Sequence, residues 1–368
     1  MSDLTPKLAL MFMSSITIRL GRLARERIAR EGLRASDVAI VPAAAGGPKG
    51  LILNGLDLWL FGSFLKDAPR PRTLVGASIG AWRMAASAFD DPVAGHRRLA
   101  HLYAHQRYPA KVTAAYISEN IRNLLDELLD GRGAEVIAHP HHHVNILTVR
   151  GTGALGRSNG VRWREMAGFL MAAAGNAVAR SRLAASMERV VFHSAQDNAQ
   201  WLRQPFDAFA AHFVDLSTDN LRDALQASGS IPLVLEAVTD IAGAPPGPHW
   251  DGGLIDYHLH LPYQRDPGLV LYPHFSDHIV PGWLDKSMPW RRANDAAMDN
   301  MILVSPSAAF VASLPNGKLP DRKDFTAYGQ HHDTRIRHWL HAIGESERMA
   351  EAFARWCEQP DLKATLSF

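Results

Sequence analysis

The sequence predicts an α/β protein with a central, mostly parallel sheet flanked by helices in three layers. Short apolar runs of strand type alternate with longer helical segments along the chain, as in sheets built from strand–helix–strand units. Two of these runs lead directly into glycine-rich turns that are followed by helices. The length of 368 residues and the hydrophobic fraction of 47% are sufficient for one large core.

An apolar stretch at residues 8–13 is short and lacks the small-residue cleavage signature of a secretory signal peptide. The charged run from Arg19 to Arg34 predicts an amphipathic helix, because leucine and isoleucine recur among its arginines. We therefore expect residues 1–36 to form an N-terminal amphipathic segment. Packing on the sheet is the first interpretation of this segment, and a basic face at a membrane interface is the second.

The first predicted strand, residues 37–45, leads into the turn Gly46-Gly47-Pro48-Lys49-Gly50 and then a helix. Glycines allow several backbone N–H groups to point into one concavity, which suits an anion or a developing oxyanion. A phosphate-binding P-loop requires Gly-Lys-Ser/Thr at its end, whereas Lys49 precedes Gly50. An oxyanion loop and an ordinary tight turn remain, with Lys49 either holding the loop or meeting a phosphate head group.

A second strand, residues 73–77, enters the sequence Gly76-Ala77-Ser78-Ile79-Gly80, and a helical segment follows over residues 81–89. This pattern is typical of a nucleophile elbow, in which a serine occupies a sharp, strained turn between strand and helix. Gly76 and Gly80 leave room for the strand and the helix to approach each other. The start of the helix directs N–H groups and the positive end of its dipole toward the serine. The alternative is a flexible or packing turn.

Further strand-like runs at residues 144–149, 190–192 and 212–216 are separated by helical segments. The segment 166–179 is apolar nearly all round but is too short and too interrupted by glycine to span a bilayer. A buried helix is its first interpretation, and a lid or lipid-facing cap that includes Phe169, Leu170 and Met171 is its second. A strand at residues 301–304 and a final helix at residues 335–356 complete the prediction.

The triplet Asp251-Gly252-Gly253 follows a breaker-rich loop at residues 242–248. An aspartate before two glycines is, taken alone, compatible with a plain Asx turn. Taken with the turn at 46–50, the elbow at 76–80 and the segment Ala-Ser-Gly-Ser-Ile-Pro at 227–232, the triplet completes an ordered set of motifs. In order and spacing, this set resembles the patatin-like phospholipase family over roughly residues 37–262.

The resemblance implies a three-layer patatin-like fold, with a catalytic domain at residues 37–265 and a C-terminal extension at 266–368 packed on it. It also implies that Ser78 is the nucleophile and that Asp251, in its Asp-Gly motif, is the only side-chain partner of that serine. The oxyanion hole would be the loop of Gly46, Gly47, Lys49 and Gly50, completed by the N–H of Ile79.

The function expected from this resemblance is lipid acyl hydrolysis: cleavage of carboxylic esters of phospholipids or other glycerolipids through an acyl-serine, with a Ser-Asp dyad. An acyltransferase that uses the same acyl-serine is one alternative. A catalytically idle lipid-binding protein is another, suggested by Pro48, which has no N–H, and by residues 254–258, which lack the family's common ending. A Ser-His-Asp triad is the competing hydrolase mechanism; His258 and His260 lie close after Asp251, and His274 and His278 follow.

Composition narrows the classes of partner, compartment and cofactor that this protein is expected to have. The 39 basic and 37 acidic side chains give a net charge of +2, which does not favour nucleic acid as a partner. A single cysteine, Cys357, fits a reducing compartment and a cytoplasmic location, with peripheral membrane contact as a further expectation. No metal is assigned to the consecutive histidines at 141–143, and no cofactor to the glycine pattern at 151–156, because neither has the spacing of a built site.

Overall fold

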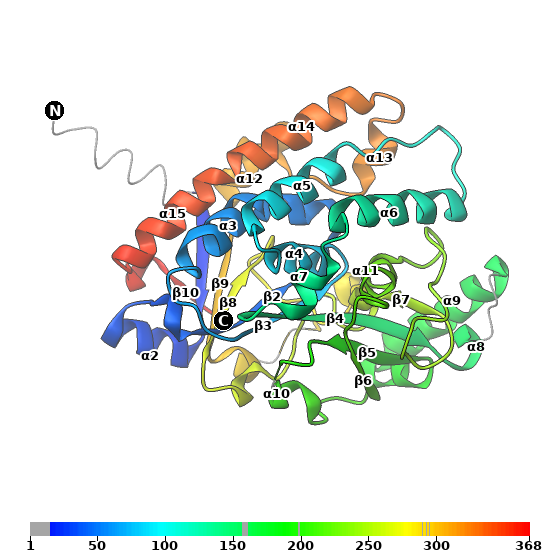
Figure 1. The fold of residues 1–368 in the computed structure, drawn as a ribbon, viewed down its shortest axis with the longest axis horizontal. Helices are drawn as coiled ribbons and strands as arrows, with labels where there is room; N and C mark the ends of the chain where they lie inside the picture. Colours follow the sequence, from blue (N-terminus) through cyan, green and yellow to red (C-terminus); the bar gives the residue numbers. More distant parts are fainter. Residues whose placement is uncertain (1–14, 157–160, 198, 289, 292, 294) are drawn as a thin grey trace.

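The protein is described from a computed structural model covering residues 15–156, 161–197, 199–288, 290, 291, 293 and 295–368. Its strands form one mixed, mostly parallel sheet between helices (Figure 1), which confirms the predicted α/β class. The strands are β1 (Ile16–Leu20), β2 (Val38–Ala43), β3 (Arg72–Ala77), β4 (His142–Gly151), β5 (Met187–His193), β6 (Ala211–Asp215), β7 (His249–Asp251), β8 (Leu269–Pro273), β9 (Met301–Pro306) and β10 (Leu366–Ser367).

The strand order is β10-β1-β9-β8-β2-β3-β4-β5-β6, and β7 pairs with β4 beside this path. The central strands β9, β8, β2, β3 and β4 run parallel to one another, whereas β1, β5 and β7 are antiparallel to the neighbours β9, β4 and β4. Strands β3, β8 and β9 are buried along their whole length. Such continuous burial is expected of parallel strands that are covered on both faces.

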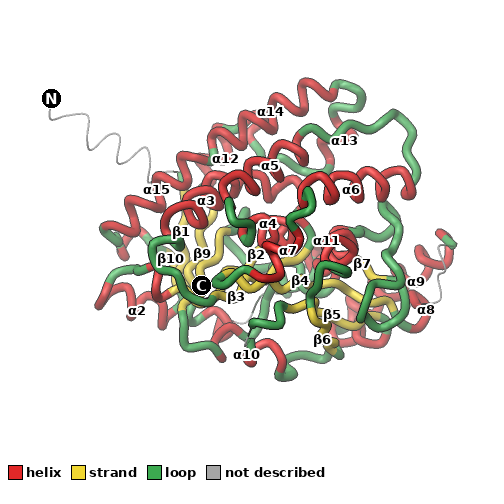
Figure 2. Tube along the Cα trace, in the orientation of Figure 1, coloured by secondary structure: helices red, strands yellow, loops and turns green. Residues whose placement is uncertain are grey.

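Helices cover both faces of the sheet. In Figure 1, α3, α4, α5, α6 and α14 lie on one face and α2 and α10 on the other; Figure 2 shows the strands between them. The helices are α2 (Arg22–Glu31), α3 (Asn54–Trp59), α4 (Ile79–Ser87), α5 (Pro92–Ala104), α6 (Ala114–Leu129), α7 (Gly133–Ala138), α8 (Gly153–Gly156), α9 (Arg162–Val178), α10 (Gln200–Arg203), α11 (Leu221–Gly229), α12 (Ala308–Ser313), α13 (Lys323–Ala327), α14 (His332–Glu345) and α15 (Glu347–Glu358).

The N-terminal segment differs from its prediction. The helix expected from Arg19 begins at Arg22, and residues 16–20 form strand β1 instead. Ile16, Ile18 and Leu20 are buried and alternate with less buried residues, a period of two that favours a strand over a helix. Residues 1–14, which include the apolar stretch at 8–13, lie outside the described residues.

The sheet also crosses the domain boundaries predicted at residues 36 and 265. Strand β1 comes from the predicted N-terminal segment, and β8 and β9 come from the predicted C-terminal extension. Strand β8 pairs directly with β2, the first strand of the predicted catalytic domain. The predicted final helix is divided into α14 and α15 at Ser346, whose hydroxyl accepts a hydrogen bond from the N–H of Gly55 at 2.8 Å.

Helix α9 is buried along one side only, so the first interpretation of this segment, a buried helix, is wrong for its outer face. Gly168, Ala172 and Asn176 face the protein, whereas Leu170 is 64% and Met171 59% exposed. Within the part of the chain that the structure describes, no helix is both long enough and apolar enough to cross a bilayer.

Candidate active site

The register of the sheet brings Ser78 and Asp251 to the same place. Ala77, the last residue of β3, pairs with Leu147 of β4, and Thr148, the next residue of β4, pairs with Asp251 of β7. Ser78 follows Ala77 directly, so both side chains lie at the carboxyl edge of the parallel strands. This edge is where open α/β sheets bind their ligands.

Ser78 occupies the strained turn that the sequence predicts. Its backbone angles are φ 56° and ψ −132°, a conformation that costs a non-glycine residue about 1–3 kcal/mol. The flanking glycines permit the turn, because a Cβ on Gly80 would lie 1.9 Å from the carbonyl oxygen of Ala43 and one on Gly76 would lie 2.6 Å from the Cα of Ala81. Gly76 therefore allows β3 and α4 to meet at Ser78, and Gly80 allows α4 to approach the end of β2.

Ser228, at the end of α11, holds this turn in place. The backbone N–H of Ser78 donates to the Ser228 hydroxyl at 2.8 Å, and that hydroxyl donates to the carbonyl of Leu147 at 2.7 Å. Ser228 is fully buried. It lies in the segment 227–232 that contributed to the sequence resemblance, but no local pattern indicated that its hydroxyl would join β3 to β4.

Asp251 is fixed by its backbone and by the two glycines after it. Its N–H donates to the carbonyl of Ser230 at 2.9 Å, and its Oδ1 accepts from the N–H of Gly253 at 2.7 Å. A Cβ on Gly252 would lie 2.2 Å from the carbonyl oxygen of Leu147. Glycine at this position allows the chain to turn tightly against β4, so that the carboxylate remains beside Ser78.

The surroundings of Asp251 favour its protonated form. Burial raises the pKa of Asp251 to about 6, although the Gly253 N–H, the Ser78 side chain and the positive charges of Arg322 and Lys286 act in the opposite direction. A buried carboxylate loses its hydration, which penalises the charged state. A pKa near the working pH is the property required of a general base.

The glycine turn at 46–50 lies beside Ser78, where the resemblance places it. Gly47 begins a 3-10 helix (Gly47–Leu53) and Ile79 begins α4, and the first N–H groups of a helix have no carbonyl partner within it. Gly46 and Lys49 line one cavity at Ser78, and Gly47 and Ile79 line another. Gly50 packs against Ile79, since a Cβ there would lie 3.1 Å from its side chain. The oxyanion-hole assignment stays a prediction.

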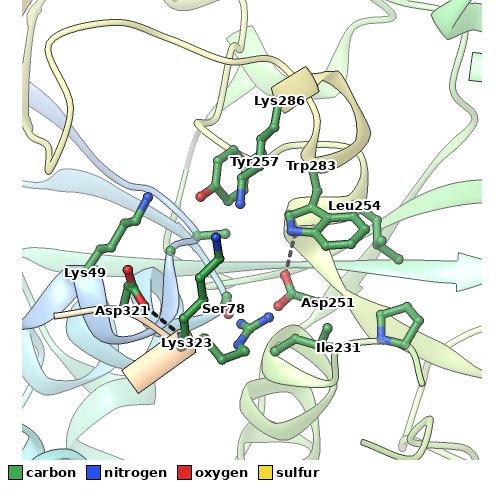
Figure 3. Close-up of a pocket in the computed structure, with 15 residues that line it drawn as sticks. Lys49, Ser78, Ile231, Asp251, Leu254, Tyr257, Trp283, Lys286, Asp321 and Lys323 are labelled. Atoms are coloured by element: carbon green, nitrogen blue, oxygen red, sulfur yellow. Dashed lines mark hydrogen bonds between the residues drawn. The ribbon is translucent and has the colours of Figure 1, made fainter. Parts of the chain in front are cut away.

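Two cavities meet at Ser78. The first has a volume of about 280 Å³, contains Asp251 and is bordered by the side chains of Tyr257, Trp283 and Lys286 (Figure 3). The second has a volume of about 550 Å³ and is lined mainly by apolar and aromatic side chains, among them Trp82 and Ile121. The site therefore joins a charged compartment and an apolar compartment at the serine hydroxyl.

The histidines required by the competing triad lie elsewhere. Residues His258, His260, His274 and His278 line neither of the two cavities that contain Ser78. His258 is buried, stacks on Tyr257 with ring centroids 4.3 Å apart, and its Nδ1 accepts the N–H of Val280 at 3.0 Å. A different histidine, His332, lines the apolar cavity.

Several residues that border the site were not anticipated from the sequence: Tyr257, Trp283, Lys286, Arg322 and Lys323. All five lie in the last third of the chain, where no motif marks them. Among the described residues there is no group of three histidine, cysteine or carboxylate side chains arranged to hold a metal ion.

Comparison with models of known protein families finds no match for this chain, and comparison with curated proteins finds none either.

Proposed function

We propose that this protein is a serine hydrolase of lipid carboxylic esters, with Ser78 as nucleophile and Asp251 as its general base. The observation that carries the proposal is the placement of a strained elbow serine beside a buried aspartate whose pKa is raised to about 6. The ordered motifs that resemble the patatin-like phospholipases support the same chemistry. The apolar cavity at Ser78 supports a substrate with an acyl chain.

In the acylation step, Oγ of Ser78 attacks the ester carbonyl while its proton passes to the Asp251 carboxylate. The carbonyl electron pair moves onto oxygen, where N–H groups from the 46–50 turn and from Ile79 stabilise it. Such donors contribute about 3 kcal/mol each in related acyl-transfer reactions. The tetrahedral intermediate then expels the alcohol, which takes the proton from Asp251, and leaves an acyl-serine.

In the deacylation step, water attacks the acyl-serine and Asp251 accepts its proton. Collapse of the second tetrahedral intermediate releases the carboxylic acid, and the proton on Asp251 returns to Oγ of Ser78. The cycle uses one carboxylate as base and then as acid, so a pKa of about 6 suits both roles near neutral pH.

The hydrolysis test uses p-nitrophenyl esters of increasing chain length, with and without glycerol as an acyl acceptor. A hydrolase gives free acid as the main product in both conditions, with chain-length dependence set by the apolar cavity. A shift to acylglycerol favours the acyltransferase alternative. No turnover of any ester, in a protein with intact thermal unfolding, favours the idle lipid-binding protein.

The pH dependence follows from the pKa of Asp251. Because the base must be deprotonated, we expect kcat/KM for a soluble neutral ester to rise about tenfold per pH unit below the pKa and to level off above it. The midpoint should lie near pH 6. A profile measured between pH 4.5 and 8 checks this, and a midpoint near the ordinary aspartate pKa of about 3.9 would contradict it.

A surface feature near the cavity supports a lipid substrate. The outer face of α9 exposes Trp163, Met166, Leu170, Met171 and Val178, which we call the apolar ridge. Asn176 on the same helix donates to Asp285 at 3.0 Å, and the 3-10 helix that carries Asp285 also carries Trp283 and Lys286 at the cavity. We propose that the apolar ridge contacts the lipid surface from which the substrate enters.

Replacing Leu170 and Met171 together by serine is expected to lower activity on lipid vesicles by at least about tenfold, since each side chain contributes about 1.5 kcal/mol on burial in an apolar phase. Activity on a soluble short-chain ester and the melting temperature should stay unchanged. Phe169 is excluded from this test because its ring packs against Trp250, 5.6 Å between centroids.

The matched control for the apolar ridge is Leu23→Ser, an exposed leucine on α2 at 42% exposure. It should change neither activity. A parallel fall of both activities and of the melting temperature in the Leu170/Met171 variant would show instead that α9 acts only as packing.

A further inference from the structure

Two helices begin at the edge of the candidate active site. The 3-10 helix Gly47–Leu53 contains most of the glycine turn, and α4 begins at Ile79, directly after the elbow serine. Gly47 and Ile79 line the same cavity as Ser78, and the N–H groups of these two helix starts are the donors proposed for the oxyanion hole. Two donors bind one oxygen only if their separation is fixed. The relative position of the two helices therefore decides whether the hole is formed.

A buried ion pair joins the two helices behind the site. The 3-10 helix continues directly into α3, which carries Asp57, and α4 carries Arg83. The Arg83 guanidinium donates to both oxygens of the Asp57 carboxylate, from Nε at 2.6 Å and from Nη2 at 2.7 Å. The exposed fraction is 4% for the Arg83 side chain and 1% for that of Asp57. A bidentate pair fixes both the distance and the angle between the groups that it joins.

The aliphatic part of Arg83 also contacts the glycine turn. A Cβ on Gly50 would lie 3.7 Å from Cδ of Arg83 and 3.1 Å from the side chain of Ile79. Arg83 and Ile79 are four residues apart on α4, so their side chains lie on the same face of the helix. Both of them pack against Gly50, and the ion pair therefore lies directly behind the turn.

The ion pair belongs to a buried polar cluster that also includes α5, the helix beside α3 and α4 in Figure 1. In α5, Nε2 of His96 lies 2.9 Å from the hydroxyl of Ser87 and its Nδ1 lies 3.7 Å from the Asp57 carboxylate. Burial lowers the pKa of His96 to about 4, so this imidazole is neutral at neutral pH. Ser87, His96 and Asp57 have the residue types of a catalytic triad, but each is at most 1% exposed. No substrate reaches them, and the cluster is not a second active site.

Stability alone does not explain why this ion pair is buried. Nη1 of Arg83 is buried and has no hydrogen-bond partner among the described residues. Burial removes the hydration of both charges, and apolar side chains of similar size often give equal or greater stability. The best-attested use of such pairs is to fix one arrangement of the elements that they join. The elements joined here are the two that meet at the elbow serine.

We propose that Asp57 and Arg83 are positioning residues: their ion pair holds the glycine turn and the start of α4 at the separation at which both donate to one oxyanion. This inference rests on the proposed hydrolase function, which it deepens by naming residues on which the oxyanion hole depends. Neither residue lines a cavity at Ser78. Loss of the pair should therefore change kcat and leave KM unchanged.

The first experiment replaces the pair by apolar side chains. The double variant Asp57→Leu/Arg83→Met leaves no unpaired buried charge, so its melting temperature should stay close to that of the wild-type protein. Its kcat for a soluble ester should fall about 10- to 100-fold at unchanged KM. An unchanged kcat in the folded double variant overturns the proposal.

A second variant decides the question if the double variant does not fold. Arg83→Lys keeps the positive charge beside Asp57 but cannot form the bidentate bonds. Its kcat should fall about three- to tenfold at unchanged KM. An unchanged kcat in this variant then overturns the proposal.

The second experiment separates the oxyanion from substrate binding. With an alkyl trifluoromethyl ketone, Oγ of Ser78 adds to the ketone carbon, the carbonyl electron pair moves onto oxygen, and the serine proton passes to Asp251. The methyl ketone of the same chain length binds without this addition. The affinity for the trifluoromethyl ketone should fall at least about tenfold in the double variant, and that for the methyl ketone should not change. Equal losses for the two ketones would show a general distortion of the site and would overturn the proposal.

The matched control is another ion pair with a buried carboxylate, between Arg27 of α2 and Asp37. The two side chains are 2.7 Å apart, and the Asp37 side chain is 4% exposed. Asp37 immediately precedes β2 and so lies at the opposite edge of the sheet from Ser78. Arg27→Met/Asp37→Leu should leave kcat and both ketone affinities unchanged. A fall in kcat as large as in the Asp57/Arg83 variant overturns the proposal, because any buried pair would then have the same effect.

Hydrogen exchange of the backbone N–H groups at residues 46–53 tests the positioning without any substrate. Exchange there should be at least about tenfold faster in the double variant than in the wild-type protein, and unchanged in the control. If this difference is found but the wild-type protein hydrolyses no ester, the hydrolase function is overturned and the positioning of the turn stands. If the wild-type protein hydrolyses esters and neither exchange nor kcat changes in the variant, the proposal is overturned and the function stands.

Discussion

Replacing Ser78 by alanine is expected to reduce ester hydrolysis by at least about 10⁴-fold while leaving the fold intact. The substitution removes the attacking oxygen, and no other side chain of the site occupies the same place. The backbone N–H of residue 78 still donates to Ser228, so the turn retains its main restraint. Steady-state hydrolysis of a soluble ester, together with thermal unfolding, measures both parts of this prediction.

The matched control for Ser78→Ala is Ser63→Ala, which alters an exposed serine between α3 and β3. It should retain wild-type activity. If the Ser78 variant kept more than a small fraction of the wild-type rate, the assignment of the elbow serine as nucleophile would be wrong.

Asp251→Asn is expected to reduce hydrolysis nearly as much as Ser78→Ala, because an amide cannot accept the serine proton. The amide oxygen can still accept the Gly253 N–H that Oδ1 accepts in the wild-type protein at 2.7 Å. The loss should therefore appear in kcat rather than in folding. Comparing kcat, KM and the melting temperature of the two variants tests this.

Although Asp251→Asn should lower activity, it should raise the stability of the folded protein at neutral pH. The pKa of Asp251 is raised from 3.8 to about 6 by burial, so the stability that the neutral form provides is present below pH 4 and is lost as the pH rises through about 6. At neutral pH the charged form costs roughly 2–3 kcal/mol of the free energy of unfolding. Asp251→Asn should remove this loss, and denaturant unfolding at pH 4 and pH 7 would measure it.

Histidine variants provide the control for the base. His258→Gln and His260→Gln should retain most of the activity, since neither side chain lines a cavity at Ser78. Glutamine is chosen for His258 because that side chain is buried and truncation would leave a void. A histidine variant as inactive as Ser78→Ala, at unchanged melting temperature, would favour a triad over the dyad.

The elbow could be predicted from sequence because its determinants are local. A strand, two glycines and a helix start suffice to specify the turn at Ser78, and the structure adds only Ser228 as a restraint from outside the motif. The position of Asp251 depends on a pairing of β4 with β7 across about a hundred residues. The resemblance supplied that partner, whereas periodicity or spacing alone would not.

The positions of the cationic side chains that line the cavity at Ser78 could not be predicted in the same way. Lys286 and Arg322 lie in turn-rich segments whose local sequence shows no pattern, and only the folded chain brings them to Lys49. Strand β1 was missed for another reason: its alternating residues adjoin an arginine-rich run that also fits a helix. Short segments of this kind acquire their structure from the neighbouring strand, here β9.

Labelling with a fluorophosphonate probe tests the central claim most directly, because the probe reacts only with an activated serine. The account predicts one adduct, located on Ser78 by peptide mass spectrometry, formed at a rate that rises with pH through about 6 and falls at least about 100-fold in Asp251→Asn but not in His258→Gln. An unlabelled Ser78 in folded protein, or equal labelling rates in the wild-type and Asp251→Asn proteins, would contradict it.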